Sequence, residues 1–460
     1  MSDIATLEPL YVPPAPKPPE REVASVAPFK WLSNAIEAWP DAVYEQAFYK
    51  PPWPGTPLLV CDPKAVRAIL LDQAESFPRH EVIRRIFSAV WGKGVFTAEG
   101  RAWRWQRHAA APAFRPDRVL AMVPAMTAAA EAALNRWRAA GAGGRLDLFA
   151  EMKRTTFDVI LETALSGGED FGDLDEANRQ ITAFLDDVGR LRPMDFLPWP
   201  EALRGSPDNR GGGATRYLRR HIGAMVARRR ATPSRKGDLV DLLLCASDPE
   251  TGEAMDDVVL RDNLIGFIAA GHDTTATALT WSLYLAFAHA PTQARLVEEI
   301  RAVAGDAPIG PEHIERLVFT KQVLQEAMRL YPPAALVVTR APSRDIEVDG
   351  HRIRKGEMVS VPIYALHRHR AYWTNPDAFD PDRFAPEIGL DKQRFLYMPF
   401  GAGPRICMGA TFAMIEMMAV LATLVRAVRL EHDPSHRIRP LVRSTLRPEG
   451  GMPMTVQFRG

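Results

Sequence analysis

Cysteine is scarce in this chain, with three residues, Cys61, Cys245 and Cys407, among 460. The number is odd, and the spacing matches no common metal-binding pattern. The set therefore predicts no disulfide framework and favours a reducing compartment. With two cysteines outside the segment around Cys407, an iron-sulfur cluster is also excluded.

An excess of charge of either sign is missing as well. The chain has 57 basic and 56 acidic residues, so nothing indicates an electrostatic nucleic-acid binder. It also lacks internal repeats and a long linker rich in glycine and serine. The apolar fraction of 47% is enough for a large core. Although the length would allow about three average domains, one large domain is the better prediction.

The N-terminus has no basic segment followed by an apolar run, and no stretch long enough to cross a bilayer. It carries six prolines between Pro9 and Pro19, which disfavour both helix and sheet. We therefore expect an extended arm over residues 1–25 and the main domain over residues 26–460. We also expect a soluble, cytoplasmic protein without a membrane anchor.

Helical periodicity dominates the rest of the chain. It predicts helices over residues 116–139 and 149–164, and a much longer one over residues 256–290. The long helix would span roughly 50 Å at about 1.5 Å per residue, with Asp256 as its N-cap and Pro291 as its stop. Short β-like runs occur at residues 57–60, after Pro333 and near the C-terminus. The fold class is therefore mainly α with a minor β component.

Residues 400–409 read Phe-Gly-Ala-Gly-Pro-Arg-Ile-Cys-Met-Gly and precede an apolar helical run. Taken alone, Cys407 could be one more buried thiol, because free cysteine is among the most buried residue types. Its position before a helix N-terminus, between glycines, would however stabilise a thiolate that can bind a metal. Both interpretations fit the single residue.

Two further motifs are ambiguous in isolation. Residues 270–275 read Ala-Gly-His-Asp-Thr-Thr within the long predicted helix, and such polar residues could simply lie on a solvated face. Glu326 and Arg329 share one helix face at a spacing of three residues. That spacing usually means a surface ion pair worth a few tenths of a kcal/mol.

The segment at residues 400–409 resembles the haem-binding loop of the cytochrome P450 superfamily at every fixed position of Phe-x-x-Gly-x-Arg-x-Cys-x-Gly. The resemblance implies the cytochrome P450 fold, a single large helical domain with small β-sheets. It also implies haem b as cofactor, with Cys407 as the axial thiolate on iron and Phe400, Gly403 and Gly409 packed around the sulfur.

The other motifs recur in the order that this family shows, so the resemblance assigns them roles. Asp273 and Thr274 match the acid-threonine pair that activates oxygen, and Glu326, Arg329 and Arg383 match a buried structural network. The expected haem-propionate partners are Trp103, Arg107, Arg340 and Arg405, with His367 as a further candidate. Expected substrate-pocket residues are Phe96, Phe267, Ala270, Ala334, Leu336 and Val337.

By this resemblance the chain is a monooxygenase that inserts one atom of O2 into a small hydrophobic organic substrate, most simply by hydroxylating a C–H bond. No flavin, nicotinamide or iron-sulfur motif is present, so electrons should come from a separate ferredoxin or flavodoxin-like protein with its reductase. Its expected docking face carries Arg104, Arg115, Arg118 and Arg394. Two alternatives remain: a peroxide-driven hydroxylase of the same fold, and a non-catalytic haem or gas sensor.

Overall fold

The computed structural model describes residues 11–13, 34–53, 55–139, 141, 143–165, 167, 173–188, 212–232, 237–336, 338–389 and 393–459. Most of the predicted N-terminal arm, residues 1–25, lies outside these ranges, and the domain boundary at residue 26 stays a prediction. Of the arm, Tyr11 forms an isolated β-bridge with Phe379, and its hydroxyl lies 2.6 Å from that of Tyr284.

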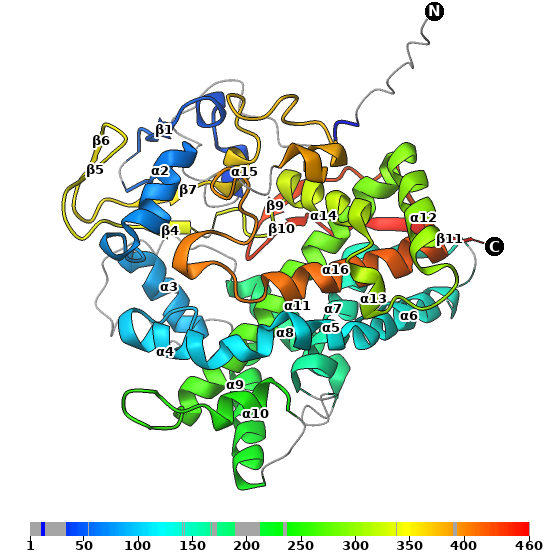
Figure 1. Cartoon of the computed structure of the whole chain (residues 1–460), viewed down its shortest axis with the longest axis horizontal. Coiled ribbons are helices and arrows are strands. Elements are labelled where there is room, and N and C mark those ends of the chain that lie inside the picture. The colour runs from blue at the N-terminus through cyan, green and yellow to red at the C-terminus, as the bar shows by residue number, and fades with distance from the viewer. Residues whose placement is uncertain are drawn as a thin grey trace, which may run out of the picture.

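Helices make up most of the described structure, as expected for the predicted fold class (Figure 1). The longer ones are α3 (Glu81–Trp91), α4 (Gly100–Ala110), α6 (Val123–Ala139), α7 (Leu148–Leu165), α8 (Leu174–Val188), α9 (Gly212–Ala231), α11 (Asp257–Ala288), α12 (Ala290–Ala304), α14 (Val318–Leu330) and α16 (Ala410–Ala427). The shorter ones are α2 (Pro63–Arg67), α5 (Pro116–Ala121), α10 (Leu239–Cys245), α13 (Pro311–Ile314) and α15 (Ile363–Leu366).

Helix α11 runs through the centre of the molecule and packs against α7, α9, α14 and α16. Its bounds agree with the prediction for residues 256–290. Asp256 caps it by accepting hydrogen bonds from the backbone amides of Val258 and Val259. It ends at Ala288, and Pro291 lies in the first turn of α12, where a missing amide hydrogen is tolerated.

The prediction of one helix over residues 116–139 was wrong in one respect, because the structure divides it into α5 and α6. The break falls at Met122, two residues before Pro124. Proline cannot donate a backbone hydrogen bond, and its ring clashes with the preceding turn, so it is accommodated in the first turn of a new helix. The predicted helix at residues 149–164 is present as α7.

The β component consists of small sheets beside and among the helices (Figure 1). The four-stranded sheet has the order β1 (Phe48–Tyr49), β2 (Leu58–Val60), β7 (Val359–Val361) and β4 (Val338–Arg340), with β2 and β7 parallel and Leu58 opposite Val359. The three-stranded sheet has the order β3 (Arg145–Asp147), β11 (Pro453–Phe458) and β8 (Val428–His432). Two hairpins remain: β5 (Ile346–Val348) with β6 (His351–Ile353), and β9 (Pro440–Val442) with β10 (Leu446–Pro448).

Helix α16 is long and apolar enough to cross a membrane, and it is the one such helix in the described part of the chain. Its apolar residues are accounted for by the core, because 67% of it is buried inside the protein. It packs against α6, α11 and α14. The segment that contains Cys407 leads directly into this helix.

Candidate haem site

The loop before α16 holds Cys407 in a tight backbone arrangement. The amide of Cys407 donates to the carbonyl of Phe400 at 3.0 Å, and the amide of Ile406 donates to the carbonyl of Gly403 at 3.1 Å. Gly403 has a φ of 74°, and a Cβ atom there would lie 1.9 Å from the carbonyl oxygen of Leu70. Only glycine therefore permits this path of the loop.

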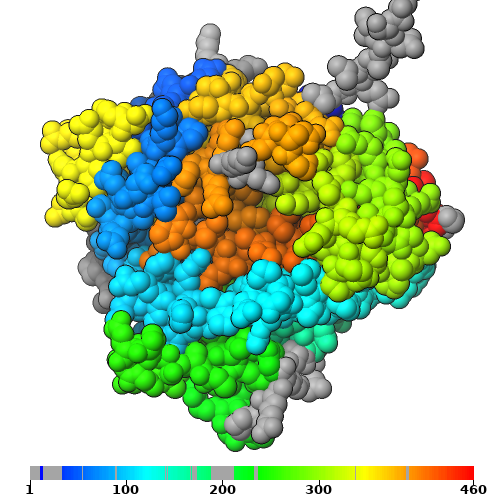
Figure 2. Space-filling view, viewed as in Figure 1, coloured from blue at the N-terminus to red at the C-terminus, as the bar shows by residue number. Residues whose placement is uncertain are grey.

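Cys407 itself is exposed, two residues before Gly409, which is the N-cap of α16. Desolvation of the sulfur by surrounding protein atoms is the largest effect and raises the pKa of the thiol. The backbone of Gly409 and the guanidinium of Arg107 oppose this shift. In Figure 2 the segment around residue 400, coloured orange, reaches the surface between the blue segment around α2 and α3 and the cyan helices. An accessible sulfur that faces a helix N-terminus fits a metal-binding thiolate better than an inert buried thiol.

Several arginines converge near this loop. Arg405 donates to the carbonyl of Ala98 at 2.9 Å, forms an ion pair with Glu99, and lies over the ring of Trp103 at 4.4 Å. Arg107 lies 5.8 Å from the same ring and donates to the carbonyl of Ile406 at 2.9 Å. The predicted set of Trp103, Arg107 and Arg405 is thus brought together around one indole ring.

Arg340 also belongs to this arginine cluster. Its backbone forms a β-bridge with Arg79, a further member that sequence reasoning missed. Burial and the charge of Arg405 lower the pKa of Arg340 to about 10. Burial, Arg405 and Arg340 together lower the pKa of Arg79 to about 9. No local pattern marks Arg79, because its partners are hundreds of residues away in sequence.

The charge of this arginine cluster shows whether the residues present fit a haem. Arg79, Arg340 and Arg405 repel one another in a desolvated place, and the acidic side chain that offsets their charge is Glu99. Such an excess of positive charge in a partly desolvated place is stabilised when carboxylates are bound to it. The two propionates of a haem are the right chemistry, and Cys407 supplies the thiolate, so the site fits the group.

His367 has no recorded contact with the arginine cluster in the described residues, and its expected place as a further propionate partner stays a prediction. Its ring is buried, and Nε2 accepts a 2.9 Å hydrogen bond from the amide of Met398. Burial and the charge of Arg329 lower its pKa to about 3. The ring of His367 is therefore neutral. No group of three or more metal-ligating side chains was found in the described residues.

The motif at residues 270–275 lies in the middle of α11, which remains continuous there. The Thr274 hydroxyl donates to the carbonyl of Ala270 at 2.6 Å. A Cβ atom on Gly271 would lie 2.6 Å from Cδ1 of Ile160, so this glycine permits close packing of α7.

Asp273 is 2% exposed and is held by two hydroxyls from the loop between β9 and β10. Ser444 donates to its Oδ2 atom at 2.9 Å and Thr445 at 2.8 Å. Lys153 on α7 is half-buried; this partial burial lowers its pKa, and the charge of Asp273 opposes that shift. Asp273 is thus a buried carboxylate that accepts hydrogen bonds from two hydroxyl groups. Such a chain of exchangeable groups is what a proton relay needs. No motif in the sequence marks Ser444, Thr445 or Lys153.

Glu326 and Arg329 are both completely buried and form a two-point ion pair, with distances of 2.7 and 2.8 Å. Arg329 also donates to the carbonyls of His367, Pro376 and Ala378. Nε of Arg383 lies 3.4 Å from Oε1 of Glu326. These distances show a buried network linking α14 to the segment before the Cys407 loop, and not a solvated surface pair.

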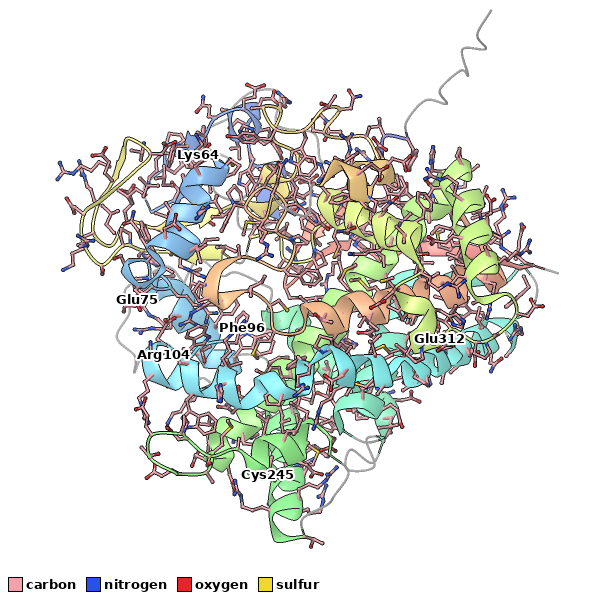
Figure 3. All side chains as sticks on the ribbon, viewed as in Figure 1. Lys64, Glu75, Phe96, Arg104, Cys245 and Glu312 are labelled. Atoms are coloured by element: carbon pink, nitrogen blue, oxygen red, sulfur yellow. The ribbon has the colours of Figure 1, made fainter. Side chains whose placement is uncertain are left out.

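The expected pocket residues are distributed over several elements. Phe267 on α11 packs against Phe114 with ring centroids 5.7 Å apart. Phe96, which lies between α3 and α4, packs against Phe87 and Trp91 (Figure 3). Ala334 and Leu336 are half-buried, and Ala270 is exposed. Val337 lies outside the described residues. Their contact with a substrate stays a prediction.

A mainly helical fold with an accessible cysteine before one core helix, an acid-threonine pair in another and a cluster of arginines beside them defines a haem-thiolate protein. The cytochrome P450 family model matches residues 52–454, and the chain therefore belongs to this family. The cofactor of the family is haem with a cysteine thiolate as axial ligand, and the chain is accordingly a cytochrome P450 monooxygenase.

Relatives and solved structures agree with the family assignment. Cytochrome P450 4A24 of Sus scrofa is 31% identical over 83% of this chain and 78% of its own length. Cyclooctat-9-en-7-ol 5-monooxygenase of Streptomyces melanosporofaciens is 30% identical over 83% of this chain and 82% of its own length. The crystal structure of the cytochrome P450DA heme domain has a TM-score of 0.79 at 26% identity and covers 90% of each chain.

Proposed function

We propose that this monooxygenase hydroxylates a C–H bond of a small hydrophobic substrate, using O2 and electrons from a separate protein in the cytoplasm. The observation that carries the proposal is the intact pair on α11, with Asp273 held by two hydroxyls and Thr274 beside it. An enzyme that delivers protons to bound oxygen needs both groups. A peroxide-driven hydroxylase receives its oxygen already reduced and does not.

When bound, the haem supplies activation of dioxygen at an iron whose thiolate ligand favours O–O cleavage. The residues of the chain do the remaining work. Cys407 would hold the iron, while Arg79, Arg340 and Arg405 would bind the propionates. Asp273 would accept and release the proton to be transferred, because its carboxylate is kept in place by Ser444 and Thr445. The Thr274 hydroxyl would pass that proton on.

The substrate class is inferred from the residues expected to line the pocket. Phe96, Phe267, Ala270, Ala334 and Leu336 offer apolar surface, which favours a hydrophobic ligand. The name of one relative states that it acts on cyclooctat-9-en-7-ol, and another relative is named taurochenodeoxycholic 6 alpha-hydroxylase. These names support a carbon-rich substrate such as a terpenoid, steroid, fatty acid or aromatic compound.

Four exposed arginines near the Cys407 loop support a separate electron donor with an acidic surface. Arg104 lies on α4 (Figure 3), Arg118 on α5, Arg115 just before α5 and Arg394 before the loop. The charge of Arg115 is partly offset within the protein, because this arginine forms an ion pair with Asp117 at 3.1 Å. We infer a small ferredoxin or flavodoxin-like protein, because complementary charge speeds the encounter of such partners.

The experiment that tests the proposal supplies the holoprotein with a ferredoxin, its reductase and nicotinamide cofactor under isotopically labelled O2. The substrate is first chosen by the spin-state change it causes in the haem spectrum. We expect a hydroxylated product that carries one labelled oxygen. Product formed with hydrogen peroxide alone would favour the peroxide-driven alternative, and substrate binding without product under either condition would favour the sensor.

A further inference from the structure

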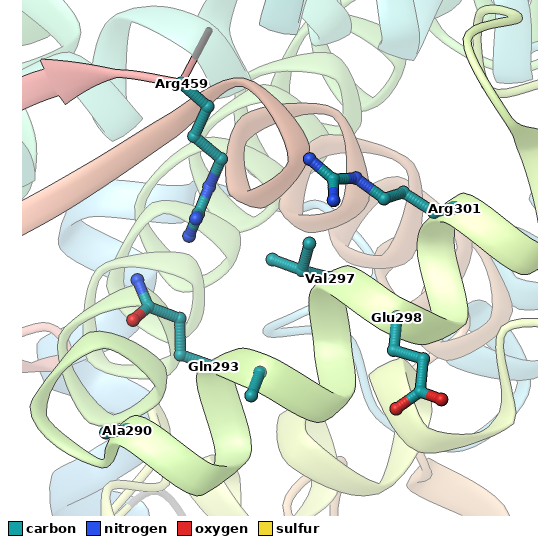
Figure 4. A pocket seen from close by; sticks show the side chains of 7 residues that line it. Ala290, Gln293, Val297, Glu298, Arg301 and Arg459 are labelled. Atoms are coloured by element: carbon teal, nitrogen blue, oxygen red, sulfur yellow. The ribbon is translucent and has the colours of Figure 1, made fainter.

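A basic groove lies between α12 and the end of β11 (Figure 4). None of the haem-site residues lines it. It has a volume of about 500 Å³. Its polar lining consists of Gln293, Glu298 and Arg301 from α12 and Arg459, which follows β11. Val297 forms an apolar part of the wall. The groove is open to solvent and is not an enclosed cavity.

Arg459 is fixed in the groove by the end of α16. Its Nε atom donates to the carbonyls of Val425 at 3.2 Å and Val428 at 3.1 Å. Its Nη2 atom is buried and has no hydrogen-bond partner among the described residues. Burial and the charges of Arg301 and Arg429 lower the pKa of Arg459, so positive charge accumulates here.

Gln293 lies opposite Arg459, and its amide can present either a donor or an acceptor to the groove. Its Nε2 atom is buried and likewise finds no partner in the part of the chain that the structure describes. Figure 4 shows the Gln293 amide and the Arg459 guanidinium pointing toward one another across the groove, with Arg301 directed toward the same space. The carboxylate of Glu298 points away from them.

Buried donors without acceptors are costly, and two neighbouring guanidinium groups repel each other. Both problems are removed by one ligand that brings several acceptor oxygens and negative charge. A carboxylate or phosphate group meets that need, because a guanidinium binds such a group through two parallel hydrogen bonds. The groove is larger than one such group, so it leaves room for the small molecule that bears it.

We propose that this groove binds a small organic oxyanion, held by Arg301, Arg459 and Gln293. The bound anion joins α12 to the end of α16, because Arg459 also contacts the carbonyls there. Helix α16 begins just after Cys407. Binding should therefore stabilise the packing of α12 against the helix that follows the haem loop.

The test is calorimetric titration of the haem-loaded protein with glycerol 1-phosphate, succinate and inorganic phosphate, at an ionic strength held constant with sodium chloride. We expect saturable binding of at least one organic anion, with one ion per chain. Comparison of the first two probes distinguishes a phosphate ester from a carboxylate, and inorganic phosphate reports whether the bare group suffices. A haem spectrum that does not change shows that the haem site is not the site of binding.

Arg301→Gln is the principal variant, because Arg301 is exposed and its replacement should not disturb folding. We expect its affinity to fall about tenfold or more, as for loss of a charge-assisted hydrogen bond. Gln293→Leu should weaken binding as well. Arg316→Gln is the matched control, an exposed arginine outside the groove, and should bind like the original protein. Absence of saturable binding, or equal affinity in Arg301→Gln and Arg316→Gln, would overturn the proposal.

Discussion

The Thr274 hydroxyl donates a 2.6 Å hydrogen bond to the carbonyl of Ala270, one turn earlier in α11. The bond lies within a helix that is held in place by extensive packing on α7 and α9. Its removal should therefore affect the reaction and leave the fold intact. This separates the contribution of Thr274 to proton delivery from any contribution to stability.

Replacing Thr274 with alanine should leave haem and substrate binding largely unchanged while diverting electrons to hydrogen peroxide. The measurement is the ratio of product and peroxide formed to nicotinamide consumed. Thr274→Ser is the matched control, because serine keeps the hydroxyl and should retain most of the coupling. Full coupling in Thr274→Ala would show that Thr274 has no part in proton delivery.

Glu326→Ala should fail at an earlier stage, with little haem-loaded protein recovered. Arg329 would remain completely buried without its carboxylate, at a cost of roughly 3 to 5 kcal/mol. Arg329→Ala should behave similarly. The control is Arg179→Ala, which removes an exposed ion pair with Glu176 at the same three-residue spacing and should leave the haem content unchanged. Normal haem content in Glu326→Ala would contradict the structural role.

The docking face predicts that partner-dependent reduction slows as ionic strength rises, because exposed charges are screened beyond about 10 Å at 0.1 M salt. Replacing Arg104, Arg118 and Arg394 with glutamate should slow reduction at low salt by stopped-flow measurement. The change at Arg115 should be smaller, since Asp117 already offsets its charge. Arg316→Glu serves as the control. A rate indifferent to salt and to these substitutions would rule out this face.

Glu416 provides a pH-dependent prediction. It is fully buried in α16, neither carboxyl oxygen has a partner among the described residues, and burial raises its pKa well above 4.5. The folded protein therefore keeps a proton that the unfolded chain releases. Stability due to this proton is complete below about pH 4.5 and is lost as pH rises toward the folded pKa, by at most about 1.4 kcal/mol per pH unit.

Glu416→Gln should remove this dependence, because the amide is neutral and of similar shape. Its advantage over the original protein in the urea midpoint should grow between pH 5 and pH 8. Glu431→Gln, an exposed residue on β8, is the control and should track the original protein. Parallel pH profiles for Glu416→Gln and the original protein would mean that Glu416 is not protonated in the folded state.

Local signals explain which parts of the fold could be predicted. Helix α11 was placed to within two residues at its ends because Asp256 caps it and Pro291 follows it. Pro124 was present in the sequence as a break, but the apolar periodicity on both sides of it favoured one continuous helix. The break shows that the missing backbone amide hydrogen of a proline can outweigh a regular helical pattern of apolar residues.

The site was predictable only where its residues lie in short motifs. The segments around Cys407, Asp273 and Glu326 each carry several fixed residues close together. Arg79 meets Arg340 across the fold, and Ser444 reaches Asp273 from 171 positions away, so no sequence window contains either pair. The role of His367 stays a prediction, because a histidine near arginines has the same appearance in sequence whether it binds a carboxylate or a backbone amide.

The central claim is that Cys407 is the thiolate ligand of the haem, and the ferrous carbon monoxide spectrum tests it most directly. The original protein and Cys245→Ala, which changes an exposed cysteine elsewhere, should both show the red-shifted band that a thiolate ligand produces. Cys407→Ala should lose that band together with monooxygenase activity. A Cys407→Ala protein that retained the band would contradict the assignment.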